Sequence, residues 1–587
     1  MIGPTYSKSL NASSLADGWL RFFTSENETL HESNPGEFSA LLIVAAVAVL
    51  AILPVMIYGI PSNVDLSNHF RFAVPFYESI RAGHLYPGWL AETNGGLGDP
   101  SFRFYPPGLY YLLAATRALT GNWYAASVLT FTLISVTGGL GMYFWARVVL
   151  PRNIAICAAV IYTLAPYHVN QLYQALMLAE YAASAVLPFA FAFAHRVCRS
   201  GRKRDMAGLA AAYALLILTN LPLAVIGSLA LMAYALLCVD WKKDLGSTLL
   251  RLLLSALLGL AASACFWVTM IAELKWIGLN GFLADSSVDY RRNFIFSTFS
   301  PDNLNVWWLN ILTFATVLMF LPALAYFHRG WKSERRDHNL RAVAILMVVA
   351  FLMMTYVSWP IWRLFRALQE VQFPWRWLSV VSMAGSLVAA AFIPFWIDKA
   401  RGKGRPIAIA ICGAVAISVS FTLFQLVRQA QYLSRSEFET KLQSLSSSQG
   451  LEYWWPVWAA KRVHSGASQP EITTRVDAGS RAVLIGSWQS EDRSFQVADG
   501  PAIDARVHTF YYPHWTATAS GTSLQVRPSD DGTILISLPP EATTVQLKFH
   551  EPLRSKVSAA TSVAGWGLIF VLALFPSRRS SLSRASR

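Results

Sequence analysis

The chain has 587 residues, of which 54% are hydrophobic and only 14% are charged, and its formal net charge is +14. Soluble globular chains carry about 25% charged residues, so this composition excludes an ordinary soluble domain. The basic residues gather in short clusters, at 196–204, 242–251, 329–341, 399–405 and 578–587. Short basic loops of membrane proteins face the cytoplasm. The charge therefore indicates orientation, and it does not form the basic stripe that nucleic-acid binding requires.

Apolar runs long enough to cross a bilayer predict a mainly α-helical polytopic membrane protein. The first run, 38–60, leaves the cytoplasm, and 61–107 is a long outer loop. Later runs lie at 207–219, 222–239, 251–271, 307–327, 342–359, 377–397, 406–426 and 557–575. Between 107 and 195 there are four runs where an odd number of crossings is needed, so either 108–121 or 154–165 is re-entrant or half-length. Excluding one of them predicts about twelve spans.

The predicted domains follow from these runs. A cytoplasmic N-terminal segment (1–37) precedes a transmembrane domain (38–427), and an extracytoplasmic domain (428–555) comes before the last helix (556–576) and a basic cytoplasmic tail (577–587). From residue 471 the outer domain alternates apolar and polar residues, as in "TILISLP" and "TVQLKF", between Gly, Pro and "DDG" turns. This pattern predicts short antiparallel strands and hence a small β-sandwich.

The first outer loop opens with "PSNVDLSNHFRF" and continues as an amphipathic segment, which predicts a helix lying on the membrane surface. Asp65 and His69 are four residues apart and share one face of that helix. The following stretch, "ETNGGLGDPSFRFYPPGLYY", adds Asp99, Arg103 and Tyr105. Polar residues gathered at helix ends on one side of the membrane predict a site at the interface.

The sequence also resembles a known superfamily. A carboxylate after the first helix, a surface helix and then "FYPPGLYYLLAA" look like the GT-C glycosyltransferases, polytopic enzymes that use polyprenyl-phosphate-linked sugars. More narrowly, "DLSNHF", "GHLYPGW", "GGLGDPSFRFYPP" and "VQFPWRWLS" resemble bacterial 6-pyruvoyl-tetrahydropterin-synthase-related membrane proteins, and "FYYPHWTATASG" resembles the outer β domain of YfhO-like proteins. The resemblance implies a GT-C-like bundle carrying an outer β domain. It does not imply pterin chemistry, since the sequence has no zinc-binding histidine cluster.

By this resemblance, Asp65 aligns with the carboxylate that acts as catalytic base in GT-C enzymes. A donor with a lipid-phosphate leaving group is already activated, so the enzyme needs a base for the acceptor hydroxyl. The alternative for Asp65 is an N-cap of the surface helix. His69 would orient Asp65, contact the donor phosphate or join a metal site, or it is simply a hydrogen-bonded interfacial histidine. The loop has no DxD pair, so no cofactor is expected, although Asp99 leaves room for a divalent metal.

A second outer stretch, "WRLFRALQEVQFPWRWLS", carries arginines where basic residues are unexpected. Arginine binds phosphate bidentately, so we expect the donor phosphate at Arg376, with Arg363 or Arg366, and include Gln372 from the same stretch as a candidate substrate ligand. Snorkelling at a helix end is the alternative for Arg376.

Other polar residues are candidates for substrate binding. Polar groups at membrane depth are costly and often functional, although interhelical hydrogen bonding explains them as well. These residues are His168, Gln171 and Glu180 within "PYHVNQLYQALMLAEYAAS". Arg292 within "DSSVDYRRN" lies in an outer loop, which either contacts the acceptor or is a solvated face. Glu452 within "EYWWPVW" opens the outer domain among aromatic residues that suit sugar binding or pack onto the membrane domain.

The sequence thus predicts a multi-pass glycosyltransferase of the bacterial cytoplasmic (inner) membrane, with its site facing the periplasm or exterior. It would move a sugar from a polyprenyl-phosphate donor to a cell-envelope glycan, lipid or protein, and it would have no nucleic-acid partner. A transporter or flippase for lipid-linked sugars is the alternative, although such proteins carry inverted repeats that this sequence lacks. A non-catalytic scaffold for envelope assembly is a third interpretation.

Overall fold

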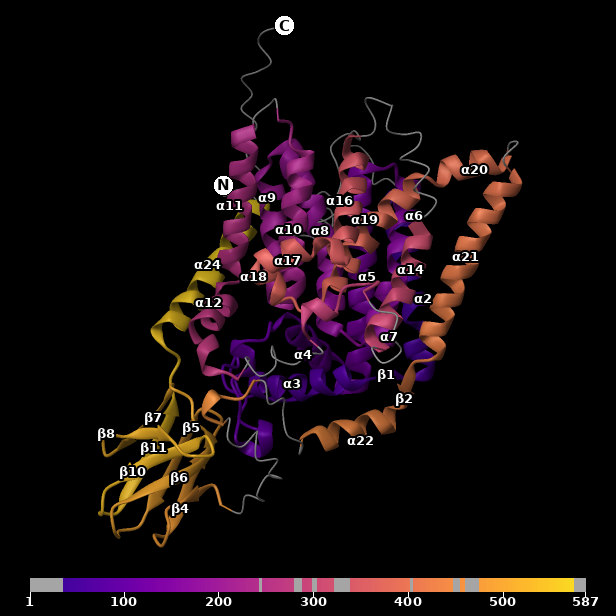
Figure 1. The fold of residues 1–587 in the computed structure, drawn as a ribbon. Coiled ribbons are helices and arrows are strands. Elements are labelled where there is room, and N and C mark those ends of the chain that lie inside the picture. The colour runs from indigo at the N-terminus through magenta and orange to yellow at the C-terminus, as the bar shows by residue number, and fades with distance from the viewer. Residues whose placement is uncertain are drawn as a thin grey trace, which may run out of the picture.

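The computed structural model describes residues 35–241, 245–278, 288–297, 304–320, 338–401, 405–446, 454–459 and 474–574. A helical bundle makes up most of the molecule, and a small β domain lies beyond one end of it (Figure 1). The predicted class, mainly α-helical with a C-terminal β region, is confirmed.

The bundle contains helices of very different lengths. In chain order they are α2 (Pro35–Tyr58), α4 (Gly108–Thr120), α5 (Trp123–Val149), α6 (Arg152–Thr163), α7 (Pro166–Tyr173), α8 (Leu178–Ser200), α9 (Lys203–Thr219), α10 (Leu221–Cys238), α11 (Leu245–Ala262), α12 (Ala264–Glu273), α14 (Leu304–Phe320), α16 (His338–Met354), α17 (Trp359–Leu364), α18 (Arg366–Gln369), α19 (Leu378–Ala391), α20 (Ile393–Arg401), α21 (Arg405–Arg428) and α24 (Leu553–Leu574). Within the described ranges, seven helices are long and apolar enough to cross a membrane, or eight if α19 and α20 form one bent span. The count of about twelve stays a prediction.

The ambiguity between 107 and 195 involves two short helices. α4 has 13 residues and α6 has 12, so length does not separate them. Their positions do: α4 packs beside the surface helix α3 (Val64–Arg81) at the β-domain end of the bundle, whereas α6 packs against α2, α5 and α19 (Figure 1). This placement favours α4 as the half-length segment.

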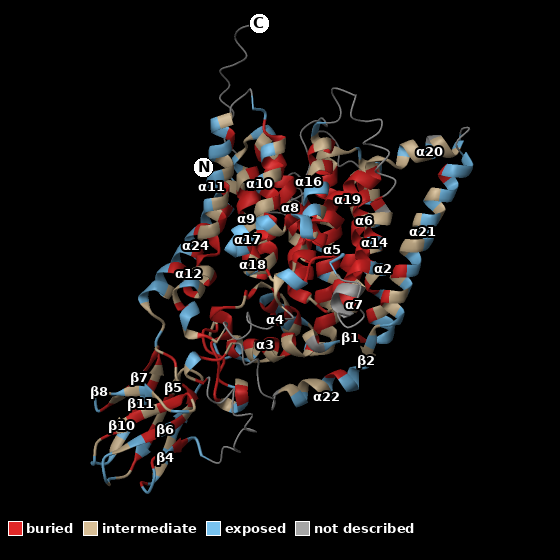
Figure 2. Ribbon diagram, in the orientation of Figure 1, coloured by how far each residue is buried: buried red, intermediate tan, exposed pale blue. Residues whose placement is uncertain are grey.

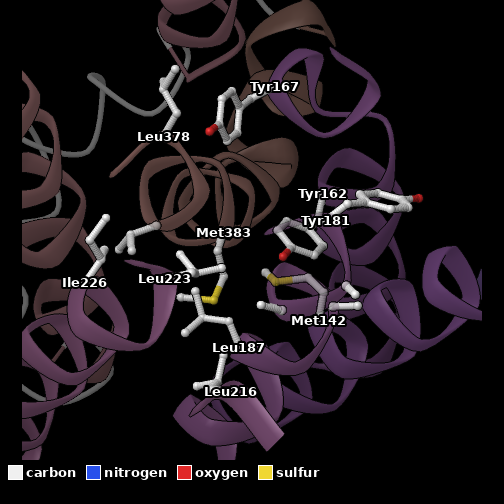
Figure 3. Packing of buried hydrophobic residues seen from close by; sticks show 14 of the residues in the cluster. Met142, Tyr162, Tyr167, Tyr181, Leu187, Leu216, Leu223, Ile226, Leu378 and Met383 are labelled. Atoms are coloured by element: carbon white, nitrogen blue, oxygen red, sulfur yellow. The ribbon is translucent and has the colours of Figure 1, made fainter. Parts of the chain in front are cut away.

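The core of the bundle is apolar and aromatic. Figure 3 shows Met142, Tyr162, Tyr181 and Met383 packed together from α5, α6, α8 and α19. Buried residues fill the middle of the bundle, while the outer helices keep exposed faces (Figure 2). On α21, for example, Ile417 is 71% exposed. Apolar faces of this size are expected to contact lipid rather than water.

Two surface helices lie at the end of the bundle that carries the β domain. α3 follows the short strand β1 (Ile60–Ser62), and α22 (Arg435–Ser446) follows β2 (Gln431–Leu433). β1 and β2 pair antiparallel, which ties the end of α2 to the end of α21. Phe438 of α22 packs edge-on against Phe70 of α3, with ring centroids 5.1 Å apart. These contacts fix the start of α3, where Asp65 lies.

The β domain is a pair of antiparallel sheets. One has the order β3-β6-β10-β9 and the other β4-β5-β11-β7-β8, as expected for a small sandwich. The strands are β3 (Val476–Asp477), β4 (Val483–Trp488), β5 (Asp492–Val497), β6 (Ile503–Phe510), β7 (Trp515–Ala519), β8 (Thr522–Leu524), β9 (Val526–Pro528), β10 (Thr533–Leu538) and β11 (Thr543–Phe549).

The first outer loop packs into the core of the β domain. The indole of Trp89 is fully buried and contacts the rings of Trp515 and Phe549. The amide of Phe510 donates to the carbonyl of Leu97. The β domain and this loop therefore share one hydrophobic core. The predicted domains instead assigned the loop to the transmembrane domain and began the outer domain at residue 428.

Candidate functional site

Asp65 lies in the first turn of α3, directly beyond β1. Because α3 begins at Val64, Asp65 is inside the helix and does not occupy the N-cap position that the alternative interpretation assigned to it. A carboxylate here is favoured by the helix dipole. Its side chain is half-buried, and Asn68 donates to it at 3.4 Å. Burial raises the pKa of Asp65, while Asn68 and the positive charge of Arg376 act in the opposite direction.

Arg376 lies in the 3₁₀ turn η8 (Pro374–Trp377), immediately before α19. Its Nε is 3.1 Å from Oε2 of Glu180, and its Nη1 donates to the carbonyl of Val371 at 2.9 Å. The guanidinium also lies over the ring of Phe373, 4.9 Å from the centroid. Its Nη2 makes no hydrogen bond within the described part of the chain. The side chain is 13% exposed, so one corner of the guanidinium remains for a ligand.

Glu180 is buried at the start of α8 and is only 2% exposed. Its Oε1 accepts hydrogen bonds from the Tyr167 hydroxyl at 2.6 Å and from Gln171 Nε2 at 3.0 Å, both on α7. The Ser379 hydroxyl of α19 donates to the same oxygen at 3.4 Å. Glu180 and Gln171 were predicted as substrate ligands. In the structure, Glu180 instead pairs with Arg376, and Gln171 hydrogen-bonds to Glu180.

His69 faces the interior one turn along α3 from Asp65. Its Nδ1 is 3.0 Å from the Tyr110 hydroxyl, and the centroids of the two rings are 6.2 Å apart. Burial lowers the pKa of His69 to about 4, so the imidazole is neutral at physiological pH. These contacts match the interfacial, hydrogen-bonded histidine, and a neutral ring does not supply positive charge for a phosphate.

Tyr105 connects Asp65 to the outer domain. Burial and the charge of Asp65 raise the pKa of Tyr105 to about 12, and its ring packs edge-on against that of Tyr110, with centroids 5.8 Å apart. The ring of Trp454 packs edge-on against Tyr105, with centroids 5.9 Å apart. Asp65, Tyr105, Arg376 and Trp454 are all half-buried, whereas His69, Tyr110 and Glu180 are buried. The side chains open to a ligand are therefore backed by a buried shell.

The structure places Asp99 and Arg103 apart from this cluster. Asp99 is buried in its own turn, where it accepts from the backbone and hydroxyl of Ser101. Arg103 is buried between Glu273 and Glu551, with all its guanidinium nitrogens donating to these two carboxylates. Both residues thus have structural partners, in place of the ligand contacts predicted for them.

His168 points away from Glu180 into the bundle. It packs on the ring of Tyr162, with centroids 4.2 Å apart, and neither ring nitrogen has a hydrogen-bond partner in the described structure. It borders a small internal cavity between α5, α6 and α8 that Ser135 and Tyr181 also line. Its position does not bring it to Asp65 or Arg376.

The remaining predicted residues lie away from the cluster or outside the described ranges. Arg363 stacks on Trp359, and Arg366 is 90% exposed and pairs with Glu370. Gln372 has a left-handed backbone, with φ of 71°, at the turn that brings the Val371 carbonyl to Arg376. Arg292 is exposed, and Glu452 lies outside the described residues.

The side chains of the site do not group as metal ligands in the described part of the chain. Across the described ranges, no three His, Cys, Asp or Glu side chains gather closely enough to hold an ion. In particular, Asp99 does not approach Asp65 as a second carboxylate. The positive charge of Arg376 acts on Asp65 and favours its ionised form.

Four residues of the site were not predicted from the sequence. Tyr110 lies in the "FYPPGLYY" motif, and Ser379 is the last residue of "PWRWLS". The positions of these two residues within the motifs could have identified them. Tyr167 is set apart from its neighbours only by the face of α7 on which it lies. Trp454 belongs to the aromatic stretch that includes Glu452.

Comparisons with solved structures found matches of low sequence identity. ArnT from Cupriavidus metallidurans, in a structure bound to undecaprenyl phosphate, matches with 17% identity and a TM-score of 0.39 over 69% of this chain and 73% of that one. Arabinofuranosyltransferase AftD from Mycobacteria matches with 15% identity and a TM-score of 0.41, over 68% of this chain and 27% of that one. The Archaeoglobus fulgidus oligosaccharyltransferase has 14% identity and a TM-score of 0.37, over 72% and 57%. At these scores, the residues of the site carry the functional argument.

The family of the chain is defined by its sequence. No curated protein matches it. The family described as "6-pyruvoyl-tetrahydropterin synthase related domain; membrane protein" matches residues 102–433, which is more than half of the 587 residues. This match includes the FYPP motif, α8 with Glu180 and the η8 turn with Arg376. The chain belongs to the family of 6-pyruvoyl-tetrahydropterin synthase related membrane proteins.

Proposed function

We propose that this protein is an integral membrane glycosyltransferase that moves a sugar from a polyprenyl-phosphate donor to an acceptor hydroxyl. The acceptor is an envelope glycan, lipid or protein. One observation carries the proposal: a half-buried carboxylate, Asp65, and an arginine with a free corner, Arg376, lie within electrostatic reach of each other at one end of an apolar bundle.

The chemistry assigns one role to each residue. Asp65 accepts the proton of the acceptor hydroxyl as its oxygen forms a bond to the anomeric carbon of the sugar. The bond between that carbon and the phosphate oxygen breaks, and the lipid phosphate leaves as an anion. Arg376 stabilises the negative charge of the departing phosphate through Nη2. The raised pKa of Asp65 makes it a stronger base than an exposed aspartate.

The reaction needs no metal in this proposal, because Arg376 supplies the positive charge at the phosphate. The site faces the extracytoplasmic side of a bacterial inner membrane, on the same end as the β domain, which lies close enough to contact the acceptor. Tyr105 and Trp454 line the boundary between the two parts.

The test uses purified protein in lipid nanodiscs with undecaprenyl-phosphate-linked sugars labelled in the sugar. Wild type is expected to transfer or hydrolyse the label from at least one donor. Asp65→Asn is expected to reduce transfer by about 10²–10⁴-fold, the usual contribution of a general base. Glu78→Gln, on the exposed part of the same helix, is the matched control and should retain full activity. Transfer that survives in Asp65→Asn would overturn the assignment, and a flippase would move the lipid without cleaving it.

A further inference from the structure

We propose that Glu180 is a positioning residue: its buried carboxylate holds Arg376 so that the Nη2 end of the guanidinium faces the donor phosphate, and it limits how strongly that phosphate is bound. This inference rests on the proposed function and assigns to Glu180 an indirect role in the same reaction.

Glu180 is arranged to hold a cation and not to contact a substrate. Three donors from two helices occupy Oε1, which leaves Oε2 for Arg376. Within the described structure, Oε2 accepts no hydrogen bond, and its partner is Arg376, whose Nε lies at ion-pair distance. A carboxylate that is 2% exposed and so fully surrounded acts on a ligand only through the arginine.

The same contacts limit how Arg376 binds an anion. The Nε of Arg376 lies 3.1 Å from Oε2 of Glu180 as an ion pair without a hydrogen bond, and Nη1 donates to the Val371 carbonyl, so Glu180 closes the Nε side of the guanidinium to an anion. The Phe373 ring covers one face of the guanidinium. An anion therefore approaches the guanidinium from the end that carries Nη2, without having to displace Glu180.

Glu180 also compensates part of the charge of Arg376. A carboxylate 3.1 Å from the guanidinium offsets much of its attraction for a second anion. This compensation favours release of the lipid phosphate after transfer, since a fully uncompensated, buried arginine would retain it. The fixed orientation of Arg376 speeds the transfer step, and the partial neutralisation of its charge by Glu180 speeds release of the lipid phosphate.

The experiment compares turnover with binding of undecaprenyl phosphate. Glu180→Gln keeps the size of the side chain but removes its charge. We expect kcat to fall roughly tenfold or more, because Arg376 loses its fixed orientation. The Kd for undecaprenyl phosphate is expected to fall by roughly threefold to tenfold, because the positive charge is no longer compensated. Glu180→Asp should partly restore kcat, because it keeps the charge.

Controls separate this role from folding and from direct contact. Glu370→Gln removes a carboxylate from an exposed arginine pair in the same outer stretch and should change neither quantity. Tyr167→Phe removes one hydrogen bond to Glu180 and keeps the charge, so it should lower kcat without tightening binding. It also tests the role if Glu180→Gln does not fold. A higher Kd in Glu180→Gln, or an unchanged kcat, would overturn the inference.

The outcomes distinguish the inference from the proposed function. If wild type binds undecaprenyl phosphate and Glu180→Gln binds it more tightly, but no sugar is transferred, the proposed function fails and the positioning role stands. If transfer depends on Asp65 but Glu180→Gln matches wild type in kcat and Kd, only the inference fails.

Discussion

The guanidinium of Arg103 and the carboxylate of Glu273 form a buried ion pair, with Nε 2.5 Å from Oε2. Arg103 belongs to the first outer loop and Glu273 to the end of α12. Tyr512 and His514 of the β domain also hydrogen-bond to Glu273, at 2.7 and 2.9 Å. One carboxylate thus joins the loop, the bundle and the β domain. Although burial favours the neutral acid, His514 and Arg103 hold the pKa of Glu273 well below its ordinary value.

Removing Arg103 is therefore expected to destabilise the whole outer end of the protein. Arg103→Gln removes the buried cation that pairs with both Glu273 and Glu551, leaving Arg554 as the one arginine beside Glu273 in the described structure, and we expect a cost of about 3–5 kcal/mol. Arg291→Gln is the control, because the exposed pair of Arg291 with Asp289 contributes about 0–1 kcal/mol. Thermal unfolding in one detergent measures both. Equal, small shifts for the two variants would show that the buried pair does not hold the domains together.

Stability of this junction should also resist acid. A carboxylate whose pKa is depressed by folding contributes stability above its unfolded pKa and loses it only as the pH falls through the folded value. For Glu273 that value lies well below the ordinary one, so the loop and the β domain are expected to stay joined at mildly acidic pH. Limited proteolysis between the two, followed from neutral to acidic pH, measures this. Release of an intact β domain already near the ordinary pKa of glutamate would contradict it.

Two neighbouring glycines in the first outer loop provide a matched pair. Gly96 and Gly98 both have positive φ, at 89° and 76°. A Cβ at Gly96 would meet open space, but one at Gly98 would come within 2.6 Å of the Trp89 indole. Gly96→Ala should cost about 1–2 kcal/mol for its backbone alone. Gly98→Ala should cost about 1–3 kcal/mol more, because the core that Trp89 shares with the β domain is overpacked. Unfolding that ranks them in reverse would disprove the shared core.

The pH dependence of transfer should reflect Asp65. The base must be ionised, and burial raises the pKa of Asp65, so kcat/KM is expected to fall on the acidic side with a midpoint above the ordinary range of aspartate. His69 should add no transition near neutrality, because its pKa is lowered to about 4 and it is neutral there. A profile of kcat/KM against pH tests both statements. A midpoint at or below the ordinary aspartate value would contradict the assigned environment.

Chelation tests whether the arginine replaces a metal. We expect transfer to continue after treatment with EDTA and dialysis, because Arg376 provides the positive charge near the phosphate. Arg376→Gln should abolish transfer whether or not Mg²⁺ or Mn²⁺ is added. Loss of activity in EDTA that Mg²⁺ or Mn²⁺ restores would show that a metal takes part.

The sequence reveals features that depend on local spacing. Asp65 and His69 lie on one surface helix, as their spacing of four residues predicts, and the β strands follow the alternating pattern. The spacing also explains His168. Tyr167 and Gln171 are four residues apart, and both hydrogen-bond to Glu180. His168 directly follows Tyr167 in the sequence, so its side chain is rotated by about 100° around the helix from that of Tyr167. Without the position of α8, no pattern shows which face of α7 meets it.

The pairing of distant charges cannot be inferred from one sequence. Arg376 and Glu180 are in contact, and Arg103 is enclosed by Glu273 and Glu551, because helices far apart in the chain pack side by side. An arginine with a carboxylate partner and one without it look identical in sequence. This is why Arg103, predicted near the substrate, lies at a structural junction instead, and why the ion pair of Arg376 with Glu180 was not predicted.

We propose that Asp65 and Arg376 act on the same lipid-linked donor. A structure of the protein in nanodiscs with bound undecaprenyl phosphate tests it most directly. We expect the phosphate within hydrogen-bond distance of Arg376 Nη2, on the side that faces Asp65, with the Glu180 pair intact. A phosphate bound at the opposite end of the bundle, or beside the exposed Arg363 and Arg366 instead, would show that Asp65 and Arg376 do not act on the donor together.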